Sequence, residues 1–248
     1  MNEFALITTK IGKNLWSVYR GGCMKLPQIH IIKYTLEDLK TLENIKEQSI
    51  LNLRKMIDIL VIDDDEFSPG DFLEKNNFRL TYKKDIDNVR DVSEYPIIMC
   101  DIRGVGKKIS ETYEGAYLIK EIKTSYPAKR VIAYTASQYD ASYNKFLNYS
   151  DELLTKGLAL EDWVTILDSQ IHKSVDPAFQ WSNLRIQLLD KGFSTIEVAK
   201  LESDFVESCK RKDFSLFEKN TSKLNSDLRG MVIEFLSSSA IKLIKGGL

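Results

Sequence analysis

The sequence predicts an α/β protein: a doubly wound, five-stranded parallel sheet with a helical extension before it and a helical bundle after it. Between residues 57 and 171, short apolar runs rich in β-branched residues alternate with amphipathic segments of helical spacing. Several of these runs show no polar alternation, which indicates strands that are buried on both faces. After Pro177 only helical patterns remain.

The composition is that of an ordinary globular protein, but its charge is unevenly distributed. The 248 residues are 43% hydrophobic and 29% charged, with a formal net charge of −1. Residues 57–171 carry fourteen Lys or Arg against twenty-one Asp or Glu, a balance of −7, whereas residues 1–56 and 172–248 have balances of +4 and +2. We therefore predict three parts: an N-terminal extension with a helix (1–56), a sheet-forming domain (57–171) and a helical C-terminal domain (172–248).

The composition also excludes several classes of protein. No stretch approaches about 18 consecutive apolar residues, and the N-terminus lacks the pattern of a signal peptide. Cys23, Cys100 and Cys209 are widely scattered, which favours reduced thiols over disulfides or a zinc site. No part has the basic excess of a nucleic-acid-binding surface. We expect a cytoplasmic protein with neither a membrane nor a nucleic acid as its partner.

The segment before the sheet is the hardest to interpret. Residues 28–34 are compatible with a short strand, and residues 14–19 with a helix turn or a strand. From Thr35 the pattern becomes clear, because Thr35 and Asp38 fit a capping box and apolar side chains then recur at helical spacing. We predict a helix over 36–54.

The remaining elements follow from apolar periodicity and from the turn residues between segments. The predicted strands are 57–62, 78–82, 96–100, 130–135 and 152–155. The predicted helices between and after them are 67–76, a short piece near 86–94, 114–125, 139–149 and 159–171. The predicted helices of the C-terminal part are 178–190, 195–210, 213–225 and 227–245.

Polar side chains follow four of the predicted strands. Asp63 and Asp64 follow the first strand, Asp101 the third, Thr135 ends the fourth, and Lys156 follows the fifth. The carboxyl ends of parallel strands lie at one edge of a sheet, where such folds bind ligands. Two carboxylates about 4 Å apart repel by roughly 4 kcal/mol at an effective dielectric near 20. A divalent cation such as Mg²⁺, which prefers oxygen ligands, offsets this repulsion, so the pattern predicts a metal site.

These residues, in this order, resemble the receiver domain of bacterial two-component response regulators. The matching stretches are VIDDD, Asp101 after IIMC, Thr135 in IAYTAS and Lys156 in LLTK, with support from EGAYLIKEIK and YPAKRVIAYTA. The resemblance covers residues 57–171 and implies a flavodoxin-like sheet.

The resemblance also implies a role for each of these residues. Asp101 corresponds to the phosphoacceptor, and the acid pair Asp63 and Asp64 to the Mg²⁺ site, with Asp64 as the direct ligand. The backbone carbonyl of Arg103 completes the metal site in this family. The side chains that contact the phosphoryl group are Thr135 and Lys156.

The family also implies partners. A sensor histidine kinase or phosphotransfer protein supplies the phosphoryl group, and the protein has no enzymatic activity beyond its own phosphorylation and dephosphorylation. The C-terminal residues show no convincing basic recognition helix. We therefore expect the helical flanking regions to contact a downstream protein, and homodimerisation is left open.

Three departures from the family pattern leave an alternative open. Gly157 follows the lysine in place of the usual proline, Leu153 occupies the position of a switching aromatic residue, and the loop over 103–113 is long. The alternative function is a receiver-like interaction or dimerisation module that works without phosphorylation. A third interpretation, a phosphatase of the haloacid-dehalogenase type, needs a Thr or Val that the stretch DDDEF does not supply.

Overall fold

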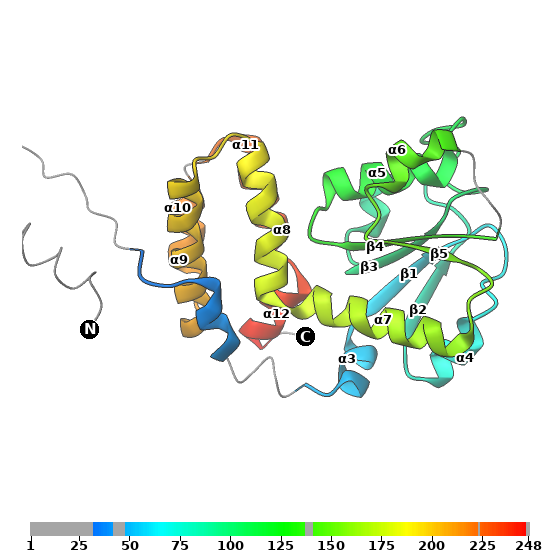
Figure 1. The fold of residues 1–248 in the computed structure, drawn as a ribbon, viewed down its shortest axis with the longest axis horizontal. Coiled ribbons are helices and arrows are strands. Elements are labelled where there is room, and N and C mark those ends of the chain that lie inside the picture. The colour runs from blue at the N-terminus through cyan, green and yellow to red at the C-terminus, as the bar shows by residue number, and fades with distance from the viewer. Residues whose placement is uncertain (1–31, 42–47, 137–140, 223, 247–248) are drawn as a thin grey trace, which may run out of the picture. The chain divides into compact units, whose positions relative to one another are not determined.

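A five-stranded parallel sheet lies between two layers of helices in the part of the structure at the right of Figure 1. The computed structural model describes residues 32–41, 48–136, 141–222 and 224–246. The strands are β1 (Asp58–Ile62), β2 (Arg79–Lys83), β3 (Ile97–Asp101), β4 (Arg130–Thr135) and β5 (Glu152–Thr155). Their order is β2-β1-β3-β4-β5, all parallel, which is the flavodoxin-like order. The predicted doubly wound sheet is confirmed, and every strand lies within one residue of its predicted bounds.

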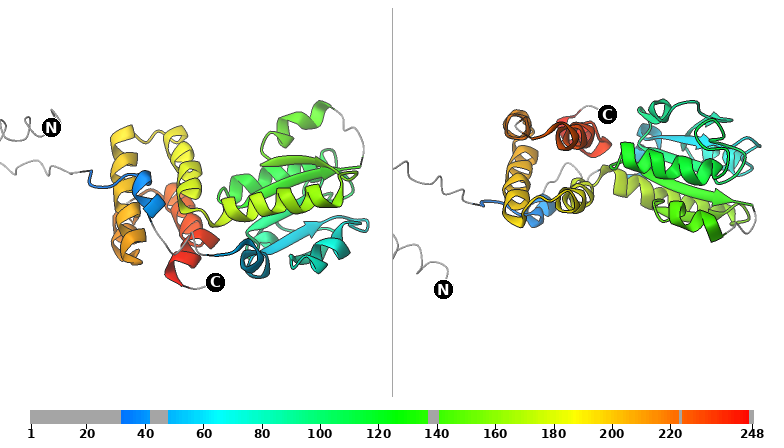
Figure 2. Two further views of the ribbon diagram at one scale, coloured as in Figure 1. Left: turned by 60° about the horizontal axis from the view of Figure 1, so that its bottom comes forward. Right: turned by 90° about the horizontal axis from the view of Figure 1, so that it is seen from above.

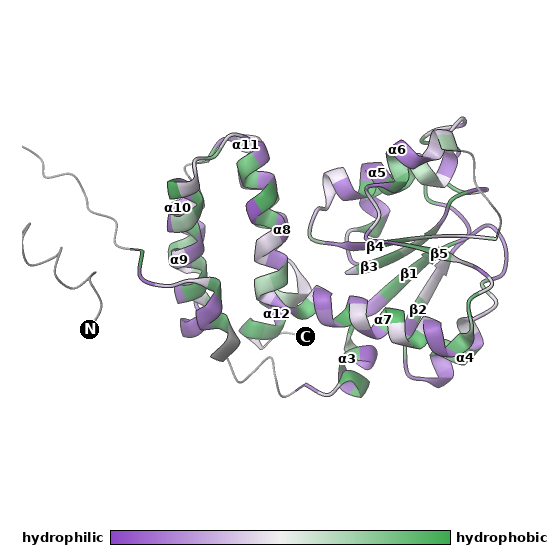
Figure 3. Cartoon of the chain, in the orientation of Figure 1, coloured by the Kyte–Doolittle hydropathy of each residue, from purple (hydrophilic) through white to green (hydrophobic). Residues whose placement is uncertain are grey.

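Helices cover both faces of the sheet, and the alternation along each strand divides the core between them. One face packs against α3 (Ile50–Met56), α4 (Gly70–Lys75) and α7 (Leu160–Val175). The other packs against α5 (Glu114–Ser125), α6 (Asn144–Leu147) and the 3₁₀ turn η2 (Val89–Val92). The strands β1, β3 and β4 are almost entirely buried, and Figure 3 shows them as hydrophobic segments. The order in which the strands are added to the sheet changes direction between β1 and β3. Such folds bind ligands at this switch point.

The C-terminal part is entirely helical in its described residues, as predicted. Its helices are α8 (Pro177–Asp190), α9 (Thr195–Arg211), α10 (Ser215–Thr221), α11 (Ser226–Leu236) and α12 (Ser239–Lys245). The helices α8 and α9 lie side by side (Figure 2). Between them, the indole of Trp181 stacks on the ring of Phe205 with the centroids 4.9 Å apart. No described helix is long and apolar enough to cross a membrane.

The predicted helix over 36–54 is not continuous. Residues Leu36–Thr41 form a 3₁₀ turn (η1), and α3 begins only at Ile50. Ser49 adopts an extended conformation, and its side chain accepts a hydrogen bond from the Asn52 amide, so it starts a new helix. Apolar residues recur at helical spacing on both sides of Ser49, so the sequence pattern did not reveal this break in the helix.

The predicted helix over 227–245 is also wrong as a single element. It is broken between α11 and α12, where Ser238 is extended with φ −65° and ψ 157°. Serine in this position starts helices rather than continuing them. The helix predicted over 139–149 is shorter in the described residues, where a 3₁₀ turn (Ala141–Tyr143) leads into α6, which ends at Leu147. Interpretations of residues 1–31, including Cys23, lie outside the described residues.

Residues that precede the sheet pack into the C-terminal helices. Leu39 of η1 is 4% exposed and belongs to the same hydrophobic core as Trp181 and Phe205. The amides of Lys33 and Tyr34 both donate to Ser203 Oγ on α9, at 3.1 and 3.2 Å. The helical region is therefore built from two separate stretches of sequence. The three domain boundaries stay a prediction.

Candidate functional site

Four charged side chains meet at the carboxyl ends of the strands, and we call them the acid pocket: Asp63, Asp64, Asp101 and Lys156. Each follows or ends a strand, as the sequence predicted. One carboxylate oxygen from each aspartate lies within 4.8 Å of the others, an arrangement that could hold a metal ion. Asp63 and Asp101 are buried, whereas Asp64 is exposed. The cluster therefore has two buried carboxylates and one carboxylate that is open to solvent.

Lys156 compensates the charge of the two buried carboxylates. Its Nζ lies 2.6 Å from Asp101 Oδ2 and 2.8 Å from Asp63 Oδ2. Burial lowers the pKa of the ammonium, but the bonds to both carboxylates outweigh burial, so the pKa lies above its ordinary value. Lys156 is therefore charged at neutral pH, as a buried carboxylate pair requires.

Asp101 presents only one of its two oxygens to the pocket. Its Oδ1 accepts hydrogen bonds from the amides of Ile102 (2.6 Å) and Arg103 (3.3 Å). Its Oδ2 faces Lys156. Burial raises the pKa of Asp101 above its ordinary value, although Lys156 acts in the opposite direction. The carboxylate is thus oriented by the backbone, with Oδ2 directed at the centre of the pocket.

The loop after β3 fits closely around Asp64. Gly104 has φ +83°, a conformation that favours glycine, and a Cβ atom there would overlap the carboxylate of Asp64. The Gly104 amide donates to Glu114 Oε2 at 2.7 Å, which fixes the loop to the start of α5. Neither Gly104 nor Glu114 was predicted from the sequence. The sequence signal that could have identified Gly104 is a glycine placed shortly after Asp101, at the end of a strand.

Tyr134, another residue that was not predicted from the sequence, donates its hydroxyl to Asp63 Oδ2 at 2.9 Å. It is fully buried next to the predicted Thr135. Burial and the charge of Asp63 raise its pKa far above the ordinary value, so the phenol keeps its proton and acts as a donor. The Asp65 amide donates to the other oxygen of Asp63 at 3.0 Å. The third aspartate of the run thus contributes its backbone, while its side chain is exposed.

Thr135 and Arg103 lie at the same edge of the sheet. Thr135 ends β4, is buried, and accepts a hydrogen bond on its carbonyl oxygen from the Lys156 amide at 2.8 Å. The Arg103 guanidinium lies 5.7 Å from the ring centroid of Tyr143. That its carbonyl oxygen binds a metal stays a prediction.

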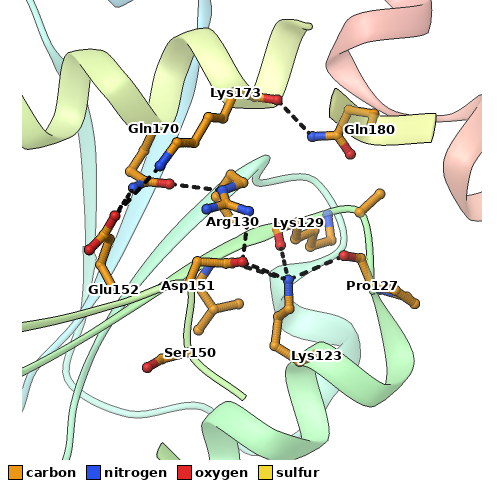
Figure 4. Close-up of polar contacts among 12 residues, drawn as sticks. Lys123, Pro127, Lys129, Arg130, Ser150, Asp151, Glu152, Gln170, Lys173 and Gln180 are labelled. Atoms are coloured by element: carbon orange, nitrogen blue, oxygen red, sulfur yellow. Dashed lines mark hydrogen bonds and ion pairs between the residues drawn. The ribbon is translucent and has the colours of Figure 1, made fainter. Parts of the chain in front are cut away.

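A second cluster of buried charges lies at the amino ends of β4 and β5, away from the acid pocket (Figure 4). The carboxylate of Asp151 receives Lys123 Nζ at 3.1 Å and Arg130 Nη1 at 2.6 Å. Arg130 Nε also donates to Gln170 Oε1 on α7 at 2.8 Å. Burial lowers the pKa of Lys123, and the Asp151 carboxylate acts against it. Because these charges pair with one another, we interpret this cluster as structural.

Two clefts open near these clusters. One, of about 520 Å³, lies beside Asp63 and is lined by Glu66, Tyr82 and Lys83 among others. Asp63 is the residue that this cleft shares with the acid pocket. The other, of about 560 Å³, lies at the opposite end of the strands, between the segment before β3, the end of α5 and the helix α11. In it, Glu234 Oε2 of α11 accepts a hydrogen bond from the Ala128 amide at 3.3 Å.

Comparisons with known proteins concern the sheet-forming part of the chain. No protein-family model and no curated protein matches. A CheY-like response regulator receiver domain protein from Methanospirillum hungatei JF-1 is 19% identical over 46% of this chain and 93% of its own, with a TM-score of 0.39. The receiver domain of NtrX from Brucella abortus is 16% identical over 46% and 97%, with a TM-score of 0.39. NtrX in complex with ADP matches 62% of this chain and 33% of its own, at 16% identity and a TM-score of 0.39.

The sheet-forming part has the flavodoxin-like fold. The strand order and the two helical layers are those of the flavodoxin-like fold. The fold that the resemblance implied is confirmed by this strand order and by the helices on both faces. At identities of 16–19%, the comparisons concern the fold alone.

Proposed function

We propose that this protein is a response-regulator-like switch, in which Asp101 accepts a phosphoryl group with the help of Mg²⁺. The observation that carries the proposal is the meeting of three aspartates with one lysine at the switch point of the sheet. Mg²⁺ in proteins is held by one or two carboxylates and keeps several waters, and this cluster, with an exposed carboxylate at its edge, is suited to that arrangement. The predicted domains, 1–56, 57–171 and 172–248, are part of this proposal.

The residues of the acid pocket suit Mg²⁺. Its three aspartates offer carboxylate oxygens, which are the ligands that Mg²⁺ prefers, and the exposed Asp64 leaves room for bound waters. Asp63, Asp64 and Asp101 would hold the ion, with the carbonyl of Arg103. When bound, Mg²⁺ neutralises the charge that develops on the phosphoryl oxygens.

The orientation of Asp101 suits it to act as a nucleophile. Its Oδ1 is held by two backbone amides, so Oδ2 is the oxygen that attacks phosphorus. The new O–P bond gives an aspartyl phosphate, while the P–N bond of a phosphohistidine, or the P–O bond of an acyl phosphate, breaks and its electron pair leaves with the donor. Lys156, already 2.6 Å from Oδ2, and the Thr135 hydroxyl would contact the transferred group. Water later hydrolyses the acyl phosphate.

The proposed partners follow from this chemistry. A sensor histidine kinase or a phosphotransfer protein would supply the phosphoryl group at the acid pocket. The helical region would contact a downstream protein or a second copy of the chain. The helix α7 runs on from the sheet into α8, so it could carry a change at the pocket to that region.

The proposal is tested by chemical phosphorylation. The protein is incubated with Mg²⁺ and acetyl phosphate, and we expect a hydroxylamine-labile phosphate on Asp101, located by mass spectrometry. Asp101→Asn should abolish the label. The matched control is Asp87→Asn, which changes an exposed aspartate paired with Lys108 and should label like the wild type. No label in the wild type, or an unchanged label in Asp101→Asn, would contradict the proposal.

The alternative is an interaction module that works without phosphorylation. It is favoured by Leu153, an aliphatic side chain 41% exposed on β5, which lacks the aromatic group that signals activation in the family. The test is amide hydrogen exchange with and without beryllofluoride and Mg²⁺. The alternative expects no change in α7 or in the C-terminal helices. Altered exchange there would reject it.

A further inference from the structure

The buried phenol of Tyr134 lies at the floor of the acid pocket. Tyr134 and Asp101 are paired residues of the neighbouring strands β4 and β3. Both side chains leave the sheet on the face that α7 covers, as does that of Asp63. The Tyr134 hydroxyl donates to Asp63 Oδ2 at 2.9 Å. This hydrogen bond links a carboxylate of the acid pocket to a side chain of the buried core.

The ring of Tyr134 is fixed by aromatic neighbours. It packs edge-on against Phe67, with centroids 5.5 Å apart, and against Trp163 of α7, at 6.1 Å. These two rings also pack on each other at 5.4 Å. Because all three side chains are buried, the hydroxyl has no room to follow a moving carboxylate. The packed rings therefore fix the position of the Tyr134 hydroxyl, and the Asp63 carboxylate is oriented towards it.

The hydrogen bonds of Asp63 leave little freedom to its carboxylate. Oδ2 accepts from Tyr134 and from Lys156, and Oδ1 accepts from the Asp65 amide. A carboxylate has about four lone-pair sites, so roughly one, on Oδ1, remains for another partner. If Lys156 turned to a phosphoryl group on Asp101, Tyr134 and Asp65 would still hold Asp63 in place.

We propose that Tyr134 is a positioning residue for the cation site, whose hydroxyl holds Asp63 in the orientation that presents the remaining lone pair of Oδ1 to Mg²⁺. This inference rests on the proposed function, because it assumes an ion at the acid pocket. Groups that orient a metal ligand in this way typically affect metal affinity by about 10- to 100-fold.

The test compares Mg²⁺ affinity by calorimetry in the wild type and in Tyr134→Phe, which removes the hydroxyl and keeps the ring. We expect about tenfold weaker binding in Tyr134→Phe. The matched control is Tyr82→Phe, because the Tyr82 hydroxyl also donates to a carboxylate, Glu74 Oε1, at 2.9 Å, but outside the pocket. The control should bind Mg²⁺ like the wild type. Equal loss in both variants would overturn the proposal.

A second readout separates positioning from a merely structural role. The rate of labelling by acetyl phosphate should be low in Tyr134→Phe at limiting Mg²⁺ and return to the wild-type rate at saturating Mg²⁺. A rate that stays low at saturation would overturn the proposal, because the hydroxyl would then act on something other than the ion.

The outcomes distinguish this inference from the proposed function. Wild-type affinity in Tyr134→Phe overturns the inference alone and leaves the proposed function intact. A wild-type protein that binds no Mg²⁺ overturns both. If Tyr134→Phe does not fold, Phe67→Leu is measured in its place, because it removes a contact that holds the Tyr134 ring. Wild-type affinity in that variant also overturns the inference.

Discussion

The Nζ atom of Lys156 lies 2.6 Å from Oδ2 of Asp101. The same ammonium lies 2.8 Å from Asp63 Oδ2, so one lysine balances two buried carboxylates. A divalent cation at the pocket would supply the same balance. If the proposed cation binds there, lysine and cation would act as partly interchangeable counter-charges, and the loss of one should increase the dependence on the other.

Lys156→Met tests this relationship, because methionine keeps much of the side chain and removes the charge. Without Mg²⁺, we expect the free energy of unfolding to fall by about 2–3 kcal/mol, since two buried carboxylates lose their partner. Saturating Mg²⁺ should reduce this loss. Lys108→Met is the control, because its pair with Asp87 is exposed and worth about 0.2–1 kcal/mol. Urea unfolding with and without Mg²⁺ gives the values, and a loss that Mg²⁺ does not reduce would count against the interpretation.

Gly104→Ala should disturb the acid pocket, because an alanine Cβ would overlap the carboxylate of Asp64. We expect a stability loss of about 1–3 kcal/mol from the positive φ and about tenfold weaker Mg²⁺ binding. Gly192→Ala is the matched control, because Gly192 has φ +91° and a Cβ atom there would have no neighbour within 4 Å. The control should lose stability but keep its Mg²⁺ affinity. The Mg²⁺ affinities are measured by calorimetry. Equal affinity in Gly104→Ala and Gly192→Ala would count against Asp64 as a ligand.

The sequence predicted those parts of the fold that depend on local pattern. Strands β3 and β4 are nearly continuous apolar runs. Such runs are typical of parallel strands that are buried on both faces. The polar residues that follow the strands, including Asp63 and Asp101, were identifiable because they interrupt these runs at one edge of the sheet. Their meeting in one pocket then follows from parallel topology.

The parts that were missed depend on contacts between distant residues. Tyr134 looks like another apolar strand residue, and only the fold shows that its hydroxyl reaches Asp63. Gly104 is constrained by Asp64, which lies on another strand end. The break at Ser49 was hidden because apolar spacing continued across it, while the first part of the predicted helix packs elsewhere, in the core of the C-terminal helices.

Leu39→Ala should destabilise the C-terminal helices, although Leu39 precedes the sheet in sequence. Its side chain is 4% exposed in the core that contains Trp181. Removing a buried leucine side chain costs about 2–5 kcal/mol, and we expect the lower half of this range. Leu51→Ala, at a leucine 52% exposed on α3, should cost less than about 0.5 kcal/mol. Urea unfolding followed by tryptophan fluorescence measures both, and similar values for the two variants would refute the packing.

Glu234→Gln should change how stability depends on pH. Burial raises the pKa of Glu234 from 4.5 to about 7, although Lys129 and the Ala128 amide act against it. Between these pH values, the folded protein holds a proton that the unfolded chain has released, so the free energy of unfolding falls as pH rises through this range. The variant should lose this fall and gain roughly 2 kcal/mol on the wild type between pH 5 and pH 7.5. Burial lowers the pKa of Lys129 to about 8, so the effect of Lys129 on stability, which has the opposite sign, begins above this pH range.

The control is Glu218→Gln, at an exposed residue of α10, which should follow the wild type in urea unfolding at both pH values. If the stability of Glu234→Gln changed with pH in the same way as that of the wild type, this would contradict a buried carboxyl at this position.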